Sequence, residues 1–294
     1  MNLWELHRRF RQFGAIEKGW SGATLKGQKA ALSCFIHRTN ITQLHELKED
    51  TLRNWFYEGR ERYQWSASNY GNYWLYFKQF FDWCLDRGFC NENPVLAISK
   101  PKRAKSLPRR ITSGQAEKLL YTSYSMPWSA HFYRLRNHAI IATFLYSGLR
   151  ASELLNLKCA HVSLAEREIF VEKGKGDKDR IVFIGEKLKI ALKPYLEEVH
   201  RQGIASLYFF SSLRGNRLTY KNLWLVIRSI GKAAKAPATC HQFRHTFASM
   251  CIENGYNPYE LQLIMGHESF QTTERYLSLT PEKAKENFLK MPSF

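Results

Sequence analysis

A length of 294 residues gives room for two domains with cores of their own, because domains usually contain about 100 to 200 residues. The hydrophobic fraction of 44% and the aromatic fraction of 14% argue against a disordered chain. A formal net charge of +18 attracts polyanions from a distance, so nucleic acid is the expected partner.

Membrane and metal partners are not expected. No apolar run approaches the roughly 20 residues that span a bilayer, and charged residues within the first ten, among them Glu5 and Arg8, argue against a secretory signal. We therefore expect a cytoplasmic protein. The six cysteines lie in apolar segments without the spacing of a zinc site, although Cys240 precedes His241, so we predict no metal and no cofactor.

The N-terminal third of the chain has apolar residues at helical spacing and no strand alternation. Ser21–Thr24 and Lys48–Thr51 have the residue types that start helices. The aromatic run Tyr70–Trp83 should form another helix that ends near Gly88, since glycine is the usual helix stop. These signals predict a small helical domain over residues 1–98.

Residues 99–111 are predicted to be a basic linker. Residues 99–110 contain two prolines, six basic residues and no acidic residue, so neither a helix nor a core would hold them. Such a segment is solvated, and it can also follow a DNA backbone while it joins two domains. The expected DNA contacts are its six basic residues, Lys100, Lys102, Arg103, Lys105, Arg109 and Arg110.

The rest of the chain, residues 112–294, is predicted to form a second, mainly helical domain with a small β-hairpin. Thr112–Glu117 is a helix start, and Arg134–Tyr146 is a buried helix rich in apolar residues. Glu168–Val171 and Arg180–Ile184 are short, rich in β-branched residues and separated by a lysine-glycine segment, which favours a hairpin. The expected fold class is therefore mainly α with a small sheet (α+β).

The first candidate for phosphate binding is Arg150. It follows Ser147-Gly148, which we expect to open a helix, and a helix N-terminus favours anions. Taken alone, a surface arginine paired with Glu153 is the simpler interpretation. Glu153 lies three residues further on and can also hold the guanidinium from behind, so both interpretations can be true together.

A second cluster begins at His241. His241 and Arg244 are three residues apart in a segment with helical periodicity, so they should share one face. His245 is expected on a different face, in a structural role. A His-x-x-Arg pair alone is weak evidence, because such short patterns recur by chance.

The third cluster contains the candidate nucleophile, Tyr276. An apolar helix should stop at Gly266, His267 follows, and Tyr276 comes nine residues later (276 − 267 = 9). A phenol with a pKa of about 10 must lose its proton to a neighbour, or be stabilised by cations, before it attacks a phosphodiester at neutral pH. Two histidines and two arginines would provide both. A core or surface phenol is the plainer alternative for Tyr276.

Attack by Tyr276 would expel a deoxyribose hydroxyl, whose oxygen needs a proton. Lys175, between two glycines at the expected hairpin tip, is the preferred general acid, with Lys173 and Lys178 as alternatives. A solvated turn lysine is the simpler interpretation of each. The phosphotyrosyl bond conserves the energy of the phosphodiester, so a second hydroxyl can reverse the step without ATP or metal.

In order and spacing these segments resemble the tyrosine recombinases, the phage-integrase and Xer family. That family places an arginine in a Thr/Ser-Gly-Leu-Arg-x-Ser-Glu-Leu segment, a lysine in a Gly-Lys-Gly hairpin, a His-x-x-Arg pair, and a Gly-His with a tyrosine nine residues beyond. The resemblance covers most of residues 112–280, with Phe243 where leucine is commoner and Cys240 before the first histidine. It implies a catalytic set of Arg150, Lys175, His241, Arg244, His267 and Tyr276, supported by Glu153.

The resemblance also implies an architecture and an assembly. Residues 1–98 would be a core-binding (SAM-like) DNA-binding domain and 112–294 the catalytic domain, together a clamp on double-stranded DNA without an arm-binding domain. A homotetramer that pairs two recombination sites, with or without accessory proteins, is the expected assembly. Residues 281–294 would be a helix exchanged between neighbours, or alternatively a tail packed on its own domain. Whether Tyr276 then acts in cis or in trans is left open.

The implied activity is site-specific DNA recombination through a 3′-phosphotyrosyl intermediate, serving integration, excision, resolution or transposition of DNA. One alternative is a non-catalytic DNA-binding regulator of the same fold. All six catalytic residue types are present, which argues against it. A type IB topoisomerase or telomere resolvase is the other alternative, because it uses the same arginine, lysine, histidine and tyrosine chemistry.

Overall fold

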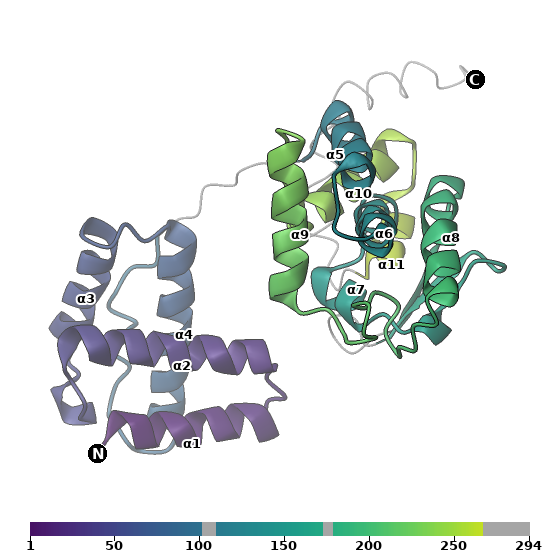
Figure 1. Ribbon diagram of the computed structural model, residues 1–294. Helices are drawn as coiled ribbons and strands as arrows, with labels where there is room; N and C mark the ends of the chain where they lie inside the picture. The colour runs from purple at the N-terminus through teal and green to yellow at the C-terminus, as the bar shows by residue number, and fades with distance from the viewer. Residues whose placement is uncertain (102–109, 173–178, 267–294) are drawn as a thin grey trace, which may run out of the picture. The chain divides into compact units, whose positions relative to one another are not determined.

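The computed structural model describes residues 1–101, 110–172 and 179–266 (Figure 1). The chain divides into two compact units, Met1–Lys105 and Ser106–Phe294. The division falls inside the stretch predicted as a linker, while the boundaries at 98 and 112 stay predictions. The expected hairpin tip at 173–178 and the expected exchange helix at 281–294 lie outside the described residues. Among the described helices, none has the length and apolar character that crossing a membrane requires.

The N-terminal unit is helical, as predicted. Asn2, Ser21 and Ser66 each cap a helix by accepting hydrogen bonds from backbone N–H groups of its first turn, which is why the helices begin there. The helices are α1 (Leu3–Ile16), α2 (Gly22–Thr39), α3 (Glu49–Glu61) and α4 (Ala67–Asp86), with a 3₁₀ turn at Leu44–Glu46.

An aromatic cluster forms the core of this unit. Trp55 is only 2% exposed, and five rings stand edge-on to it with centroids 4.7–5.4 Å away: Phe35, Phe56, Trp65, Tyr73 and Phe77. Edge-to-face contacts of this kind add to the stabilisation from burial. Trp55 of α3 therefore ties α2 and α4 together.

The C-terminal unit is built around one buried helix, α6 (His131–Ser147). Buried residues lie on nearly all sides of α6. The helices α5 (Ser113–Ser125), α8 (Glu186–Arg201) and α10 (Cys240–Glu253) pack against it (Figure 1). A capping box at Thr112 and Gln115 starts α5, as the sequence predicted. The remaining described helices of this unit are α7 (Ala151–Asn156), α9 (Tyr220–Ala233) and α11 (Pro258–Met265), with a 3₁₀ turn at Cys159–His161.

The predicted hairpin is present as β2 (Glu168–Val171) and β3 (Arg180–Phe183), which pair antiparallel with Val171 opposite Arg180. A strand that was not predicted, β1 (Val162–Ser163), pairs with β2 to complete a three-stranded sheet. Two residues are too short to show alternation, so the sequence carried no signal for β1.

The two separate cores lead to a prediction about unfolding. We expect Trp55→Ala to lower the free energy of unfolding of the N-terminal unit by about 3 to 5 kcal/mol, because it removes a buried aromatic side chain. In calorimetry of the full chain, only one of two thermal transitions should shift. Trp4→Ala is the control, because Trp4 is 40% exposed. Equal shifts of both transitions in Trp55→Ala would show that the units share one core.

Candidate active site

The site begins at the corner between α6 and α7. The expectation that Arg150 lies at a helix N-terminus is confirmed, because Arg150 is the N-cap of α7, which begins at Ala151. The expectation that Ser147-Gly148 opens this helix was wrong: Ser147 is the last residue of α6, and Gly148 ends that helix with φ +63°. A glycine in the left-handed region is the usual end of a helix, which explains the difference. A Cβ on Gly148 would lie 2.3 Å from the Phe247 ring, so the corner also requires glycine for close packing.

The predicted partners Arg150 and Glu153 are in contact. Glu153 accepts a hydrogen bond from the Arg150 backbone N–H at 2.7 Å and another from Arg150 Nη1 at 2.6 Å. The first bond closes a helix capping arrangement, and the second holds the guanidinium against the start of α7. The side chain of Arg150 keeps 23% exposure, whereas that of Glu153 is 5% exposed. Arg150 can therefore meet a ligand while Glu153 supports it.

A second arginine, Arg180, binds the same carboxylate, and this residue was not predicted from the sequence. Arg180 Nη1 and Nη2 donate to the two oxygens of Glu153 at 2.9 and 2.8 Å, and Nε donates to the Ile264 carbonyl at 2.8 Å. The sequence shows Arg180 only as the first residue of a strand. Its contact with Glu153 depends on the fold, because 27 residues separate the two.

The surroundings of Glu153 change its pKa strongly. Burial by itself would raise the pKa of this carboxyl, but the hydrogen bonds and positive charges of Arg180 and Arg150 outweigh burial and lower the pKa to about 2. Glu153 is therefore ionised at any physiological pH and offsets part of the positive charge around it.

Arg244, on α10, reaches the same place from the other side. It is 5% exposed, and its Nη1 and Nη2 each donate at 2.6 Å, to the Gly148 and Met265 carbonyls respectively. Arg244 therefore joins the corner after α6 to the end of α11.

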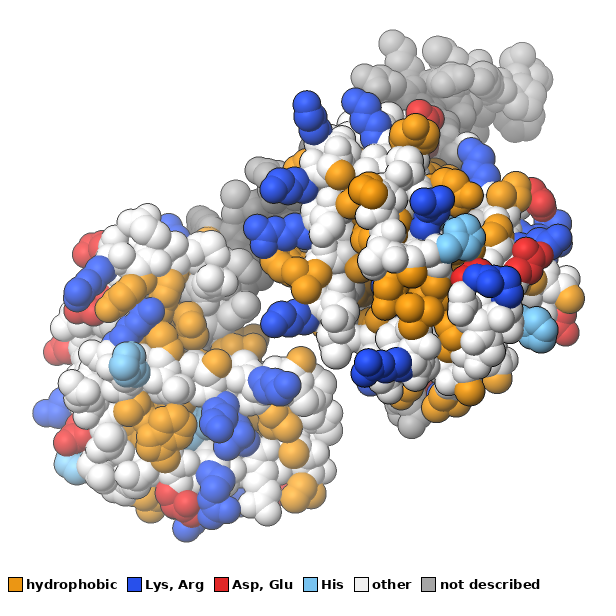
Figure 2. Space-filling view, viewed as in Figure 1, with side chains coloured by type: hydrophobic (Ala, Val, Ile, Leu, Met, Phe, Trp, Pro, Cys, Tyr) orange, Lys and Arg blue, Asp and Glu red, His pale blue; other side chains and the backbone are white. Residues whose placement is uncertain are grey.

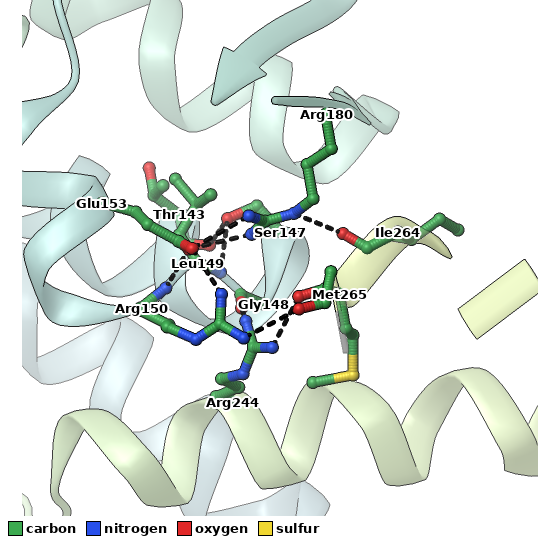
Figure 3. A network of polar contacts seen from close by, with 11 residues as sticks. Thr143, Ser147, Gly148, Leu149, Arg150, Glu153, Arg180, Arg244, Ile264 and Met265 are labelled. Carbon is green, nitrogen blue, oxygen red and sulfur yellow. Dashed lines mark hydrogen bonds and ion pairs between the residues drawn. The ribbon is translucent and has the colours of Figure 1, made fainter. Parts of the chain in front are cut away.

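The C-terminal end of α11 is the meeting point of all three arginines (Figure 3). Three successive carbonyl groups each accept from a different guanidinium: Ile264 from Arg180 at 2.8 Å, Met265 from Arg244 at 2.6 Å, and Gly266 from Arg150 at 3.0 Å. The last carbonyls of a helix lack partners within the helix and carry partial negative charge, so arginines suit them. The next residue in the chain is His267.

His241 lies on α10 one turn before Arg244. Desolvation by the surrounding protein, and then the charges of Arg244 and Arg150, lower the pKa of His241 below its usual value, although the side chain stays accessible. His245 was expected on a different face, and this was wrong. The His241 and His245 rings lie 4.2 Å apart, because residues four apart on a helix differ by only about 40° in direction.

The structure does not describe every predicted site residue. Lys175, His267 and Tyr276 lie outside the described residues, as do the linker residues Lys102, Arg103, Lys105 and Arg109. The two predicted DNA-contact residues of the linker that are described have partners within their own units. Lys100 Nζ lies 5.5 Å from the centre of the Trp74 ring, and Arg110 forms an ion pair with Glu253.

An exposed face of α9 carries a further set of basic and aromatic side chains. Tyr220, Trp224, Arg228 and Lys232 recur every four residues on α9, and we call them the α9 face. Arg228 lies over the Trp224 ring at 4.9 Å, and Tyr220 and Trp224 are 60% and 45% exposed. A surface groove beside these residues extends to Cys240, the residue before His241. Figure 2 shows lysine and arginine side chains along α9.

The Glu153 cluster generates a prediction about stability. Glu153→Gln keeps the shape of the side chain but removes the charge that Arg180 pairs with. At pH 7 we expect the free energy of unfolding of the C-terminal unit to fall by roughly 3 to 5 kcal/mol, measured by urea unfolding. Glu186→Gln is the matched control, because its pair with Arg167 is exposed and should contribute little.

The contribution of Glu153 to the free energy of unfolding should depend on pH. The pKa of Glu153 is about 2 in the folded chain against a usual value of 4.5, so the unfolded chain binds the proton more readily. The stabilisation is therefore complete above about pH 5 and is lost as the pH falls toward 2. Between pH 7 and pH 3, wild type should lose more stability than Glu153→Gln. Equal losses would contradict a depressed pKa.

Comparison with known proteins places this site in a family. Residues 109–283 match the model of the phage integrase family, which covers 175 of the 294 residues (283 − 109 + 1 = 175). The tyrosine recombinase XerD of Listeria innocua serovar 6a is 29% identical over 288 residues, 94% of this chain and 95% of that protein. XerC of Pelobacter propionicus is 32% identical over 215 residues, 72% of this chain and 69% of that protein.

Solved structures of tyrosine recombinases share the fold. The crystal structure of XerA recombinase is 26% identical with a TM-score of 0.54 and covers 99% of both chains. XerH bound to its difH substrate is 21% identical with a TM-score of 0.74, over 90% of this chain and 78% of that chain. The matched family segment contains the described cluster and every predicted catalytic residue. The chain therefore belongs to the phage integrase family, the site-specific tyrosine recombinases.

Proposed function

We propose that this chain cuts and rejoins DNA at specific sites through a 3′-phosphotyrosyl bond to Tyr276. One observation carries the proposal: Arg150 and Arg244, from different helices, bind adjacent carbonyls of Gly266 and Met265, immediately before His267. Two guanidinium groups are thereby held beside the segment that leads to the candidate nucleophile. The comparisons do not favour a non-catalytic regulator or a type IB topoisomerase.

The two arginines suit the charge that develops during the reaction. A phosphodiester under attack becomes five-coordinate at phosphorus and gains negative charge on its nonbridging oxygens, which charge-assisted N–H donors stabilise. Arg150 retains solvent exposure and can meet the phosphate, and Glu153 and Gly266 fix its direction. Because these donors are positioned before DNA binds, little reorganisation is needed.

His241 is the proposed acceptor of the proton that the nucleophile loses. Its lowered pKa favours the neutral imidazole at pH 7, and a neutral imidazole can accept a proton. The Tyr276 oxygen then forms a bond to phosphorus, and its proton passes to His241. The bond from phosphorus to the 5′ oxygen breaks, and Lys175 gives that oxygen a proton. A 5′-hydroxyl of another strand reverses these steps, so the strand is rejoined without hydrolysis.

We propose that the basic linker and the α9 face contact the DNA backbone. The net charge of +18 favours such contacts, and the aromatic members of the α9 face offer flat apolar surfaces beside the cations. Solved structures of XerH and lambda integrase are bound to DNA sites. Recombination joins two sites, so we also propose a homotetramer on DNA in the cytoplasm, with 281–294 exchanged between neighbours.

Tyr276→Phe tests the covalent step. We expect wild type to form a protein–DNA adduct that survives denaturing electrophoresis on a nicked duplex containing a sequence selected by this protein from random DNA. Tyr276→Phe should bind the same duplex with unchanged affinity and form no adduct, since it loses only the attacking oxygen. Specific binding by wild type without an adduct would favour a regulator. An adduct in Tyr276→Phe would assign the nucleophile elsewhere.

The general acid can be identified by changing the leaving group. Lys175→Ala should slow adduct formation by about 100- to 10,000-fold, whereas Lys173→Ala and Lys178→Ala should have little effect. A duplex with sulfur in place of the bridging 5′ oxygen has a leaving group that needs no proton, so it should restore cleavage by Lys175→Ala. Rescue of a different lysine variant would identify that lysine as the general acid.

A further inference from the structure

We infer that Arg180 is a positioning residue for DNA cleavage. It holds Glu153, Arg150 and the end of α11 in fixed positions relative to one another. The inference rests on the proposed function, because it concerns the rate of adduct formation. Arg180 does not need to touch DNA in this role. It acts on Arg150 through the carboxylate that both guanidiniums bind.

Strand geometry explains why an arginine points inward here. Arg180 pairs with Val171, and Ile169 pairs with Val182, so all four share one face of the sheet. The three apolar residues are 1–3% exposed, and the Arg180 side chain is 8% exposed. The exposed neighbour Ile181, at 45%, lies on the opposite face. Arg180 therefore occupies a core position at the end of the hairpin.

All three nitrogens of the Arg180 guanidinium have fixed partners. Two bind the two oxygens of Glu153 in parallel, and Nε binds the Ile264 carbonyl. Only a planar fork can satisfy a carboxylate and a carbonyl in this way, whereas the ammonium of lysine is a single point of charge. The geometry therefore defines the direction of Glu153 as well as its charge.

The position of Arg150 depends on Arg180 because the two guanidinium groups share an acceptor atom. Glu153 Oε1 accepts from both Arg150 Nη1 and Arg180 Nη1, so the position of one guanidinium depends on the other. The second anchors of these two arginines, Gly266 and Ile264, lie on the same turn at the end of α11. Loss of Arg180 would remove two hydrogen bonds from the Glu153 carboxylate and one from the last turn of α11.

The plainer interpretation is that Arg180 only neutralises a buried glutamate. The two interpretations differ in what lysine can replace. A neutralising role needs charge alone, so Arg180→Lys would retain full activity. A positioning role needs the fork, so lysine would be insufficient even if the protein remained folded. A positioning role also slows cleavage without weakening DNA binding, because all three guanidinium nitrogens of Arg180 bind Glu153 and Ile264.

The experiment compares wild type, Arg180→Lys, Arg180→Ala and Arg201→Met as full chains. Arg201→Met is the matched control, because Arg201 also binds a buried glutamate, Glu198, through two bonds of 2.7 and 2.8 Å. The probe is the nicked duplex that carries the selected sequence. Its Kd is measured by fluorescence anisotropy, and the rate of adduct formation in a single turnover is measured on denaturing gels. Thermal unfolding confirms that each variant is folded.

We expect Arg180→Lys and Arg180→Ala to form the adduct about 10 to 100 times more slowly than wild type, with Kd changed less than about threefold. Guanidinium ion at a non-denaturing concentration should accelerate Arg180→Ala, and ammonium ion should not. Arg201→Met should match wild type. A wild-type rate in Arg180→Lys, or loss of cleavage and binding in equal proportion, would overturn the inference. No adduct with wild type would instead contradict the proposed function.

Discussion

The described site depends on one arrangement, in which the last carbonyls of α11 accept hydrogen bonds from three guanidinium groups, two of which also bind the carboxylate of Glu153. Arg150, Arg180 and Arg244 would repel one another without Glu153 and the carbonyls of residues 264–266. The formal charge of these four side chains is +2 (3 − 1 = 2), which the single negative charge of a DNA phosphodiester offsets in part. The carboxylate and the carbonyls thus reduce the repulsion between the arginines, and the remaining positive charge can bind an anion.

The fold brings the members of this cluster together from distant parts of the chain. The buried helix α6 fixes the corner at Gly148, where α7 starts with Arg150, and α10 packs on α6 and places Arg244 beside that corner. The sheet contributes Arg180 through its register, and the end of α11 contributes the carbonyls that accept from the three arginines. Arg150 therefore lies at the start of α7, and His241 and Arg244 lie on α10, which favours a preorganised arrangement of these three side chains.

Local features of the sequence predicted local features of the structure. The capping residues of α2 and α5 marked where those helices begin, and the spacing of Arg150 and Glu153 predicted their contact. Arg180 was missed because its role depends on strand register and on a partner in another element. The errors at Gly148 and His245 have simple physical causes: glycine ends helices, and residues four apart on a helix are neighbours.

In the proposed mechanism, Arg150 and Arg244 bind one phosphate group of the DNA, while the last carbonyls of α11 fix the two guanidinium groups. The most direct test is an experimental structure of the Tyr276→Phe variant on an intact duplex of its selected sequence. Both guanidiniums should lie within hydrogen-bond distance of the same phosphate, with the bonds to Gly266 and Met265 retained. A phosphate bound elsewhere, or arginines that leave the α11 carbonyls to reach it, would contradict the claim.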